Sequence, residues 1–341
     1  MPPPPDLSSY ILPQETSNSI FTTQILPAEF PPNVSPSPLV LSPTDPKPPI
    51  AVLIVGQTGA GKTRLAPAVL TALTSLRRQP PAHFIADTYK TYHPAYQSLT
   101  SDPATAPLAS PATGPDARRW LRLAAAHAAH HRLDVLLESA CRHPDDFVHL
   151  ARLFRDARYR LDVLLLAVPR PLSRLGILTR FHDRLPEAGS RGLPIRLTPL
   201  KVHDDSYVGL LDAARWIDAH PDCVDRVFVV RRGNLVAFSD DAEARSGTGP
   251  GPRLLSGRVV DAVQRERERP LTPDEITVAS EDLARLQARD EAQASQIKEL
   301  LDPLLKPSVD PDAAAVFPEL KPLQFPPDGT DPEATFLLGA T

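Results

Sequence analysis

The sequence has little cysteine and no long uninterrupted hydrophobic run. Its 341 residues include 2 cysteines, Cys141 and Cys223, which cannot form the disulfide framework of a small secreted domain. No stretch approaches the roughly 18 uncharged apolar residues that a membrane-spanning helix requires. We therefore expect a protein of a reducing compartment, the cytoplasm, with no segment embedded in a membrane.

An excess of charge of one sign is also lacking, and so is a secretory signal. The 41 acidic and 37 basic side chains leave a formal net charge of −4, which gives no broad attraction for nucleic acid or anionic lipid. The opening residues MPPPPDLSSY contain neither the basic nor the apolar region of a signal peptide. We expect no nucleic acid and no membrane among the partners. With 42% apolar residues, the chain can bury a sizeable core.

Proline is the residue in excess, and its distribution indicates boundaries. There are 41 prolines, well above the ~5% that is usual, and 14 of them lie within residues 1–49. We expect a Pro/Ser-rich N-terminal arm over 1–49, in which Tyr10–Phe30 could form a docked helix or an extended arm. A folded domain should occupy 50–238, followed by a linker and helices over 239–305 and a Pro-rich tail over 306–341.

Between residues 50 and 238, short apolar runs alternate with segments of helical periodicity. Continuous apolar strands separated by helices predict an α/β fold, with a parallel sheet covered by helices on both faces and added C-terminal helices. A loop is expected over 100–115, and the helix expected over 273–305 could bind a partner or pack within the chain. The expected strands are 51–55, 83–86, 133–138, 161–168, 226–230 and 235–238, and the other expected helices are 62–77, 116–131, 144–157, 171–185, 204–218 and 254–267.

A phosphate-binding motif follows the first expected strand. GQTGAGKT matches G-x-x-x-x-G-K-[ST] between a strand and a helix, which is the context that the pattern requires. Glycines allow successive amides to converge on phosphate oxygens at a helix N-terminus, and an exposed Gly-rich turn is the alternative. Lys62 should reach the β- and γ-phosphates, and the Thr63 hydroxyl should ligate Mg²⁺. The expected nucleotide-binding residues are Gly56, Gln57, Thr58, Gly59, Ala60, Gly61, Lys62 and Thr63.

The rest of the sequence narrows the class of nucleotide protein. A GTPase would carry an N-K-x-D motif for reading the base, which this sequence lacks, and a motor or transporter ATPase would usually end an apolar strand in Asp-Glu. The apolar run LDVLLLAV instead continues into Pro169. A P-loop NTPase-type fold with small-molecule kinase activity remains, and such an enzyme needs a second site for the acceptor.

Two carboxylates are expected at the edge of the sheet where parallel strands place ligands. Asp87 follows the strand at 83–86 and could accept the proton of an attacking hydroxyl, although it could equally cap a helix. Glu138 ends the strand at 133–138 and could contact substrate or metal, or simply be a solvated strand end. Arginine side chains could stabilise the transferring phosphoryl group. Spacing alone cannot choose among Arg174, Arg180, Arg184, Arg191 and Arg196.

These motifs together resemble the zeta-toxin family of P-loop kinases. DTYKTYHP at 87–94 is similar to D-x-[FY]-[RK]-x-x-H-P, and ESACR at 138–142 is similar to E-G-T-x-R. AVP at 167–169 is similar to the segment that precedes the arginine helix of the family. Arg180 and Arg196 fall on its two phosphate-clamping arginines. The sequence departs from the pattern at Ser139 and Ala140, where the family usually has Gly-Thr.

The resemblance implies a kinase that uses ATP or GTP with Mg²⁺ to phosphorylate the 3′-hydroxyl of the amino sugar of UDP-N-acetylglucosamine, or of a related activated sugar. Asp87, Lys62, Arg180 and Arg196 would be catalytic. It also implies a possible antitoxin partner that this chain does not encode. The alternatives are a P-loop kinase of another small acceptor and a catalytically degraded nucleotide-binding module. The substrate-binding residues implied by the resemblance are Glu138, Ser139, Arg142 and His93.

Other residues that could carry chemistry have simpler interpretations. Cys141 lies near a strand end, where a small core residue is expected rather than a nucleophile. His127 and His131 have the i, i+4 spacing of metal ligands but no accompanying H-E-x-x-H pattern, which favours surface histidines. Trp120 and Trp216 are expected to pack in the core from their helices.

Overall fold

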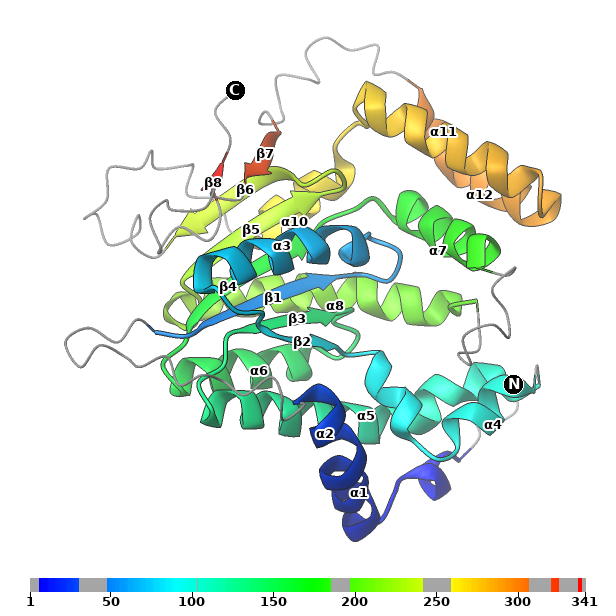
Figure 1. Cartoon of the computed structure of the whole chain (residues 1–341). Coiled ribbons are helices and arrows are strands. Elements are labelled where there is room, and N and C mark those ends of the chain that lie inside the picture. Colours follow the sequence, from blue (N-terminus) through cyan, green and yellow to red (C-terminus); the bar gives the residue numbers. More distant parts are fainter. Residues whose placement is uncertain are drawn as a thin grey trace.

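A mixed, mostly parallel sheet forms the centre of the molecule (Figure 1). The computed structural model describes residues 6–30, 48–102, 104–184, 197–241, 259–306, 320–324 and 337–338. Within this part of the chain the strand order is β2-β3-β1-β4-β5-β6-β7-β8. The strands are β1 (Ile50–Gly56), β2 (Ala82–Ile85), β3 (Val135–Ser139), β4 (Arg160–Leu166), β5 (Arg226–Arg231), β6 (Leu235–Asp241), β7 (Lys321–Gln324) and β8 (Leu337–Leu338).

The predicted parallel sheet is confirmed in five strands, and the structure adds antiparallel strands at one edge. β2, β3, β1, β4 and β5 pair in parallel, whereas β6 pairs antiparallel to β5 and β7 antiparallel to β6. Gly233 and Asn234 have positive φ angles of 77° and 59°, which suits a tight hairpin turn. β7 also shows that the Pro-rich tail supplies a strand of the sheet, which lies between β6 and β8 and in which Pro322 pairs with Leu235 of β6. Proline is tolerated there because, among the described residues, β8 pairs only with Leu323 and Gln324, so Pro322 has no ladder partner on that side.

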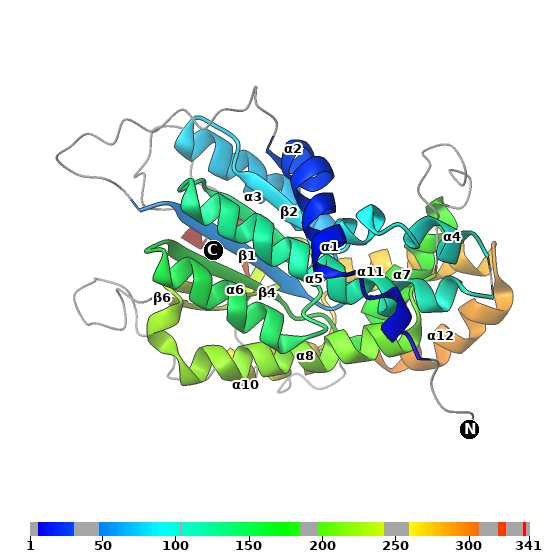
Figure 2. The same ribbon diagram turned by 90° about the horizontal axis from the view of Figure 1, so that it is seen from below.

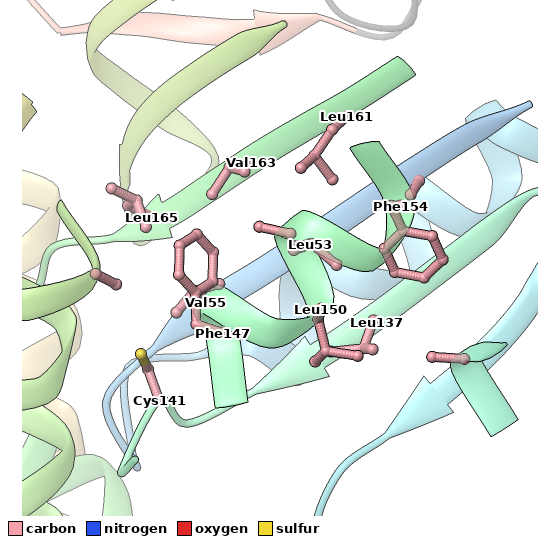
Figure 3. Packing of buried hydrophobic residues seen from close by; sticks show 14 of the residues in the cluster. Leu53, Val55, Leu137, Cys141, Phe147, Leu150, Phe154, Leu161, Val163 and Leu165 are labelled. Carbon is pink, nitrogen blue, oxygen red and sulfur yellow. The ribbon is translucent and has the colours of Figure 1, made fainter. Parts of the chain in front are cut away.

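Helices cover both faces of the sheet because the strands are apolar throughout. All seven residues of β1 are buried. Leu53 and Val55 face one cluster, whereas Val52 and Ile54 face the other, as the two-residue period of a strand requires. Figure 3 shows the first cluster, where Phe147 meets the inward side chains of the strands. Figure 2 shows α5, α6 and α8 in front of the sheet, and α3, α7, α11 and α12 contribute to the second cluster.

The described helices largely follow the predicted order. None of them is long and apolar enough to cross a bilayer. They are α1 (Gln14–Ile20), α2 (Leu26–Glu29), α3 (Lys62–Arg77), α4 (Tyr96–Ser101), α5 (Ala106–His130), α6 (Pro144–Asp156), α7 (Arg170–Arg184), α8 (Leu200–Ala219), α10 (Val259–Glu268), α11 (Pro273–Gln287) and α12 (Glu291–Leu305).

The loop predicted over 100–115 is wrong, because α5 already begins at Ala106. Pro107, Pro111 and Pro115 are spaced by four residues and none of them is buried. Since an interior proline removes the hydrogen bond to the residue four positions earlier, all the missing bonds lie on one outer face. The opposite face packs into the molecule and includes the fully buried Trp120, as predicted.

The single long helix predicted over 273–305 is also wrong. α11 and α12 are separate helices that pack against each other and against α7. Asp290 ends the connection and caps α12, because its side chain accepts a hydrogen bond from the N–H of Gln293. Of the two roles left open for this segment, the structure shows packing within the chain.

The N-terminal arm is helical and docked between residues 14 and 29. Ile25 has no solvent exposure and belongs to the same core cluster as β1. The indole Nε1 of Trp120 donates a hydrogen bond to the carbonyl oxygen of Ser17 at 3.0 Å, and the N–H of Leu12 donates to Asp116 Oδ2 at 3.1 Å. The arm is therefore part of the folded core.

Because Ile25 is fully buried, we expect Ile25→Ala to lower the free energy of unfolding by about 3 kcal/mol. Leu300 is 45% exposed on α12, so Leu300→Ala should change it by less than about 0.5 kcal/mol. Denaturant unfolding of both variants checks this. Equal, small effects would contradict the docking of the arm.

Candidate active site

The phosphate motif forms the turn between β1 and α3, as predicted. Gly59 and Gly61 have φ angles of +81° and +108°, in the region that glycine adopts most readily. A Cβ atom on Gly59 would lie 2.0 Å from the carbonyl oxygen of Ser173, so no larger residue fits there. The amides of the turn lie at the N-terminus of α3, where backbone N–H groups and the helix dipole favour anions.

Lys62 lies at the centre of the site. Its ammonium group donates a hydrogen bond to the carbonyl oxygen of Gly56 at 2.7 Å. Burial lowers the pKa of Lys62 to about 8, while Asp87 and Glu138 act in the opposite direction and Arg180 acts with burial. The sheet edge therefore gathers a lysine, an arginine and two carboxylates around the phosphate loop.

Two side chains, from α8 and α10, and one backbone carbonyl after β4 hold the phosphate loop. The Nε2 of Gln57 donates to the carbonyl oxygen of Val168 at 2.6 Å, and its Oε1 accepts from Arg267 of α10 at 3.3 Å. The N–H of Thr58 donates to the hydroxyl of Ser206 on α8 at 3.2 Å. The Gln57 side chain and the Thr58 amide are thus bound to the protein itself.

Arg232 supports the loop, and sequence reasoning missed it. One Nη of Arg232 donates to the carbonyl oxygens of Gly59 and Leu172, both at 2.8 Å. Burial lowers its pKa to about 10. Its position directly after an apolar strand is shared by many surface arginines, so the sequence carries no signal for this role.

A cavity of about 240 Å³ opens beside the loop. Its wall includes the start of α3, one face of α7 and part of α11. Thr63 lines the cavity with its hydroxyl-bearing side chain exposed. The lining residues are Gly59, Gly61, Lys62, Thr63, Arg64, Gly176, Thr179, Arg180, Asp183, Arg184, Arg232, Asp282 and Arg285.

The structure separates the five candidate arginines. Arg180 and Arg184 of α7 line the cavity. Arg174, on the same helix, instead donates to both oxygens of Asp204 at 3.1 and 3.2 Å. Arg191 and Arg196 lie outside the described residues. The helical spacing of four residues between 180 and 184 brings these two side chains to one face.

Asp87 follows β2 at the predicted edge of the sheet, and its side chain is 70% exposed. Its Oδ1 lies 2.5 Å from the ammonium of Lys90. Asp87 raises the pKa values of both Lys62 and Arg180, which places its charge close to theirs. It precedes the helical turn η3 (Thr88–Tyr92) without a side-chain capping bond, so the alternative of a helix cap is not what the structure shows.

Glu138 is not a solvated strand end, since it is only 3% exposed. Its Oε1 lies 2.9 Å from Nε2 of His83 on the neighbouring strand. The Ser139 hydroxyl accepts a hydrogen bond from the N–H of Cys141 at 3.1 Å. Arg142 donates from Nε to Asp205 of α8 at 3.2 Å. The strand end thus presents a buried acid, a hydroxyl and an arginine.

His93 is buried, and both ring nitrogens contact the protein. Nδ1 accepts a hydrogen bond from the N–H of Ala95 at 3.2 Å, and Nε2 lies 3.0 Å from the carbonyl oxygen of Tyr10. Nε2 must therefore carry the proton that it donates to that carbonyl. This arrangement ties the segment after Asp87 to the N-terminal arm.

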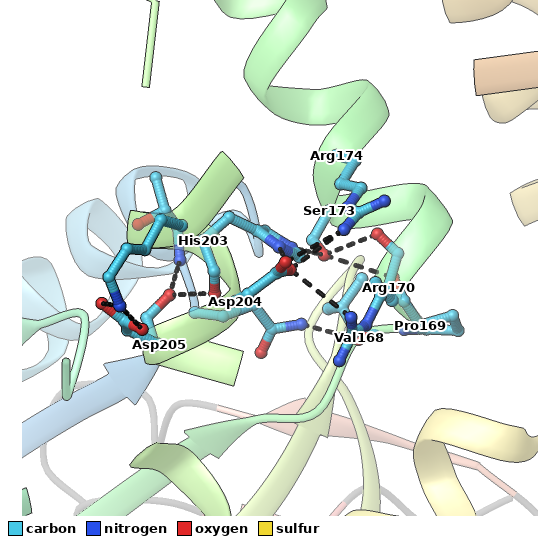
Figure 4. Close-up of polar contacts among 12 residues, drawn as sticks. Val168, Pro169, Arg170, Ser173, Arg174, His203, Asp204 and Asp205 are labelled. Carbon is cyan, nitrogen blue, oxygen red and sulfur yellow. Dashed lines mark hydrogen bonds and ion pairs between the residues drawn. The ribbon is translucent and has the colours of Figure 1, made fainter. Parts of the chain in front are cut away.

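A buried polar network joins α7 to α8 (Figure 4). The Ser173 hydroxyl lies 2.8 Å from Nε2 of His203, whose Nδ1 lies 2.9 Å from Asp204 Oδ1. Burial lowers the pKa of His203. The Ser-His-Asp arrangement is the one that activates a serine nucleophile in hydrolases. Ser173 and His203, however, have no solvent exposure. The network therefore holds α7, and with it Arg180, against α8.

The structure also locates Cys141 and the histidine pair His127 and His131. Cys141 is 2% exposed, and burial raises the pKa of its thiol to about 12, which excludes an activated thiolate. Within the part of the chain that the structure describes, no group of three or more His, Cys, Asp or Glu residues could hold a metal. The rings of His127 and His131 contact each other in a tilted arrangement, with centroids 4.2 Å apart.

Comparisons with known proteins agree with this fold. No curated protein matches the chain. Among solved structures it resembles one from the PezAT chromosomal toxin-antitoxin system of Streptococcus pneumoniae, with a TM-score of 0.55 and 18% identity over 81% of this chain and 98% of that chain. A complex of AvrRxo1-ORF1 and -ORF2 gives a TM-score of 0.43 and 15% identity over 74% and 80%.

The likeness to the pneumococcal structure shows a P-loop kinase-like fold. The family evidence is independent of it and comes from the sequence model of the Zeta toxin family, which matches residues 40–243. This match covers more than half of the 341 residues, and the chain therefore belongs to the zeta toxin family.

Proposed function

We propose that the chain is a phosphotransferase that moves the γ-phosphate of ATP or GTP to the 3′-hydroxyl of the amino sugar of UDP-N-acetylglucosamine, or of a related activated sugar. The observation that carries this is that Lys62 and Arg180 line one cavity beside the phosphate loop, and that the charge of Asp87 is close enough to raise the pKa values of both. A cation pair for the phosphates and a carboxylate for the hydroxyl are what phosphoryl transfer requires. We assign the activity to a kinase domain over 50–238.

In this proposal the loop amides and Lys62 hold the β- and γ-phosphates, and Arg180 stabilises the charge that develops on the transferring group. Arg196 lies outside the described residues, and its role as the second phosphate-clamping arginine stays a prediction. Thr63 fits a magnesium site, because its hydroxyl lines the cavity at the start of α3 and Mg²⁺ usually takes few protein ligands beside phosphate oxygens. When bound, Mg²⁺ would neutralise part of the negative charge of the phosphates.

Asp87 would act as the base. Its carboxylate takes the proton of the sugar hydroxyl as that oxygen bonds to the γ-phosphorus, and the bond from phosphorus to the β,γ-bridging oxygen breaks to release the nucleoside diphosphate. Glu138 and Arg142 would bind the sugar nucleotide from the end of β3. The Ser139 hydroxyl, which already accepts from Cys141, keeps its proton for a substrate oxygen.

Two alternatives follow from Ser139 and Ala140 replacing the usual Gly-Thr. The altered strand end could select another small acceptor, in which case a panel of nucleotides, antibiotics and sugars would show turnover where UDP-N-acetylglucosamine does not. A module without catalysis would bind ATP tightly and show no acceptor-stimulated hydrolysis. Calorimetry with a phosphate-release assay separates these cases.

We also propose a cytoplasmic location and an antitoxin partner. Both cysteines are free, which suits a reducing compartment. The similar pneumococcal structure comes from a toxin-antitoxin system, and a protein that blocked the cavity would inhibit transfer. Co-purification with the product of a neighbouring gene would test the partner.

Loss of the base should stop transfer without stopping nucleotide binding. We expect Asp87→Asn to lower the rate of sugar phosphorylation by about 10²- to 10⁴-fold, measured by mass spectrometry of UDP-N-acetylglucosamine after incubation with ATP and Mg²⁺. Asp156→Asn, at an exposed carboxylate at the end of α6, is the control and should keep the wild-type rate. Equal rates for the two variants would refute the role of Asp87.

Nucleotide affinity should fall as the pH rises through 8. The pKa of Lys62 in the free protein is about 8, and the charged ammonium is the form that binds phosphate. Above that pH the protein must take up a proton on binding, so the dissociation constant for ATP should rise by up to about tenfold between pH 7 and pH 9.

Calorimetry at several pH values, in buffers of different ionisation enthalpy, measures both the affinity and the proton uptake. The variant Lys62→Arg keeps its charge over this range and should lose the pH dependence. A wild-type affinity that is constant from pH 7 to pH 9 would contradict the assignment.

A further inference from the structure

Part of the cavity wall comes from beyond the region that the family model matches. Asp282 and Arg285 of α11 line the same cavity as Gly59 and Lys62 of the phosphate loop, whereas the family match ends at residue 243. α11 packs directly against α7. In Figure 1 the α11–α12 hairpin lies on one side of α7 and α4 on the other. The added helices therefore reach the candidate active site.

Ion pairs fix α11 at both ends. Arg231, the last residue of β5, is fully buried and donates from Nη1 to Glu275 Oε2 at 3.0 Å. Glu275 also forms a reciprocal capping box with Thr272 at the start of α11. Just beyond the other end of the helix, Arg289 pairs with Asp183 of α7. Because these contacts need no ligand, the wall is already in place before anything binds.

The charges around the cavity define two ends. Lys62 and Arg180 line the cavity, and Asp87, which is not a lining residue, raises the pKa values of both, so these two cations mark the end nearest the proposed acceptor. Asp282 instead acts on Arg232 and raises its pKa against the effect of burial. Arg232 lies under the phosphate loop, bonded to Gly59. Asp282 therefore lies at the end of the cavity next to Arg232, beneath the phosphate loop.

Asp282 is an unusual side chain for a phosphate cavity, because it is an acid and only 5% exposed. Its Oδ1 accepts a hydrogen bond from Arg285, and an ionised carboxylate can accept further bonds. A carboxylate repels phosphate, so the groups of a bound nucleotide that Asp282 can receive are the neutral O–H and N–H donors. In a nucleotide such donors are found on the ribose and on the base.

We propose that α11 forms the nucleoside-binding wall of the cavity, with Asp282 accepting hydrogen bonds from donors on the ribose or base of the bound nucleotide. This inference rests on the proposed nucleotide-binding function. The triphosphate then runs from α11 along the loop, and its γ-phosphate points toward Arg180 and Asp87. The C-terminal helices thus complete the nucleotide site of this chain.

The test compares ligands with and without a nucleoside. Full-length protein and the variant Asp282→Ala are titrated by calorimetry with ATP, with 2′,3′-dideoxy-ATP and with inorganic tripolyphosphate. We expect the variant to bind ATP about tenfold more weakly than wild type and to bind tripolyphosphate at least as well as wild type, because the substitution also removes a charge that repels phosphate. Glu281→Ala, at the exposed neighbouring residue of α11, is the matched control and should leave all three affinities unchanged.

The two possible donors give different results with the dideoxy ligand. If the ribose hydroxyls bind Asp282, dideoxy-ATP binds wild type and variant equally; if the base does, the tenfold difference remains. Tripolyphosphate also reports folding, because a misfolded variant would lose it. Equal affinities of both proteins for ATP, or an equal loss for ATP and tripolyphosphate, would overturn the inference. Failure of wild type to bind any triphosphate would instead contradict the proposed function.

Discussion

The close contact between the phosphate loop and α7 is the constraint on which the rest of the site depends. There is no room for a side chain at Gly59, where a Cβ would overlap the carbonyl oxygen of Ser173. Arg232 bridges the two elements by donating to the carbonyl oxygens of Gly59 and Leu172. Because α7 cannot shift without breaking these bonds, Arg180 is held over the same cavity as the loop.

The other parts of the site are positioned from this contact outward. The hydrogen bond between Ser173 and His203 attaches α8 to α7. The hydroxyl of Ser206, also on α8, accepts a hydrogen bond from the N–H of Thr58 in the phosphate loop. On the opposite side, α11 packs on α7 and closes one wall of the cavity. Parallel pairing of β2 with β3 brings Asp87 and Glu138 to the same edge of the sheet.

Buried cations give this arrangement its electrostatic character. Burial lowers the pKa values of Lys62, Arg232 and Arg267, which means that the folded protein holds positive charge in an environment that disfavours it. An anionic ligand relieves that cost, and the preorganised loop requires little rearrangement to receive it. This environment therefore favours an anionic group such as phosphate, while Asp282 adds an acceptor on the α11 wall of the cavity.

Local patterns in the sequence were enough to predict the phosphate loop, the five parallel strands and the place of Asp87, because glycine spacing and strand ends act over a few residues. The proline content led to wrong predictions only where tertiary packing accommodates proline within a helix or a strand. In α5 the prolines share an outer face while the inner face is buried, and Pro322 of β7 stands outside the two-residue ladder with β8. Composition alone reports neither of these environments.

Only the tertiary structure decided which arginines reach the cavity, that Arg232 supports the loop, and that α11 forms part of the wall. Each of these depends on contacts between residues far apart in the chain, such as Arg232 with Gly59 and Arg231 with Glu275. An arginine on the surface and one in a buried bridge look the same in a sequence. What separates them is the burial and the bonding partners that packing supplies, and these exist only in the folded chain.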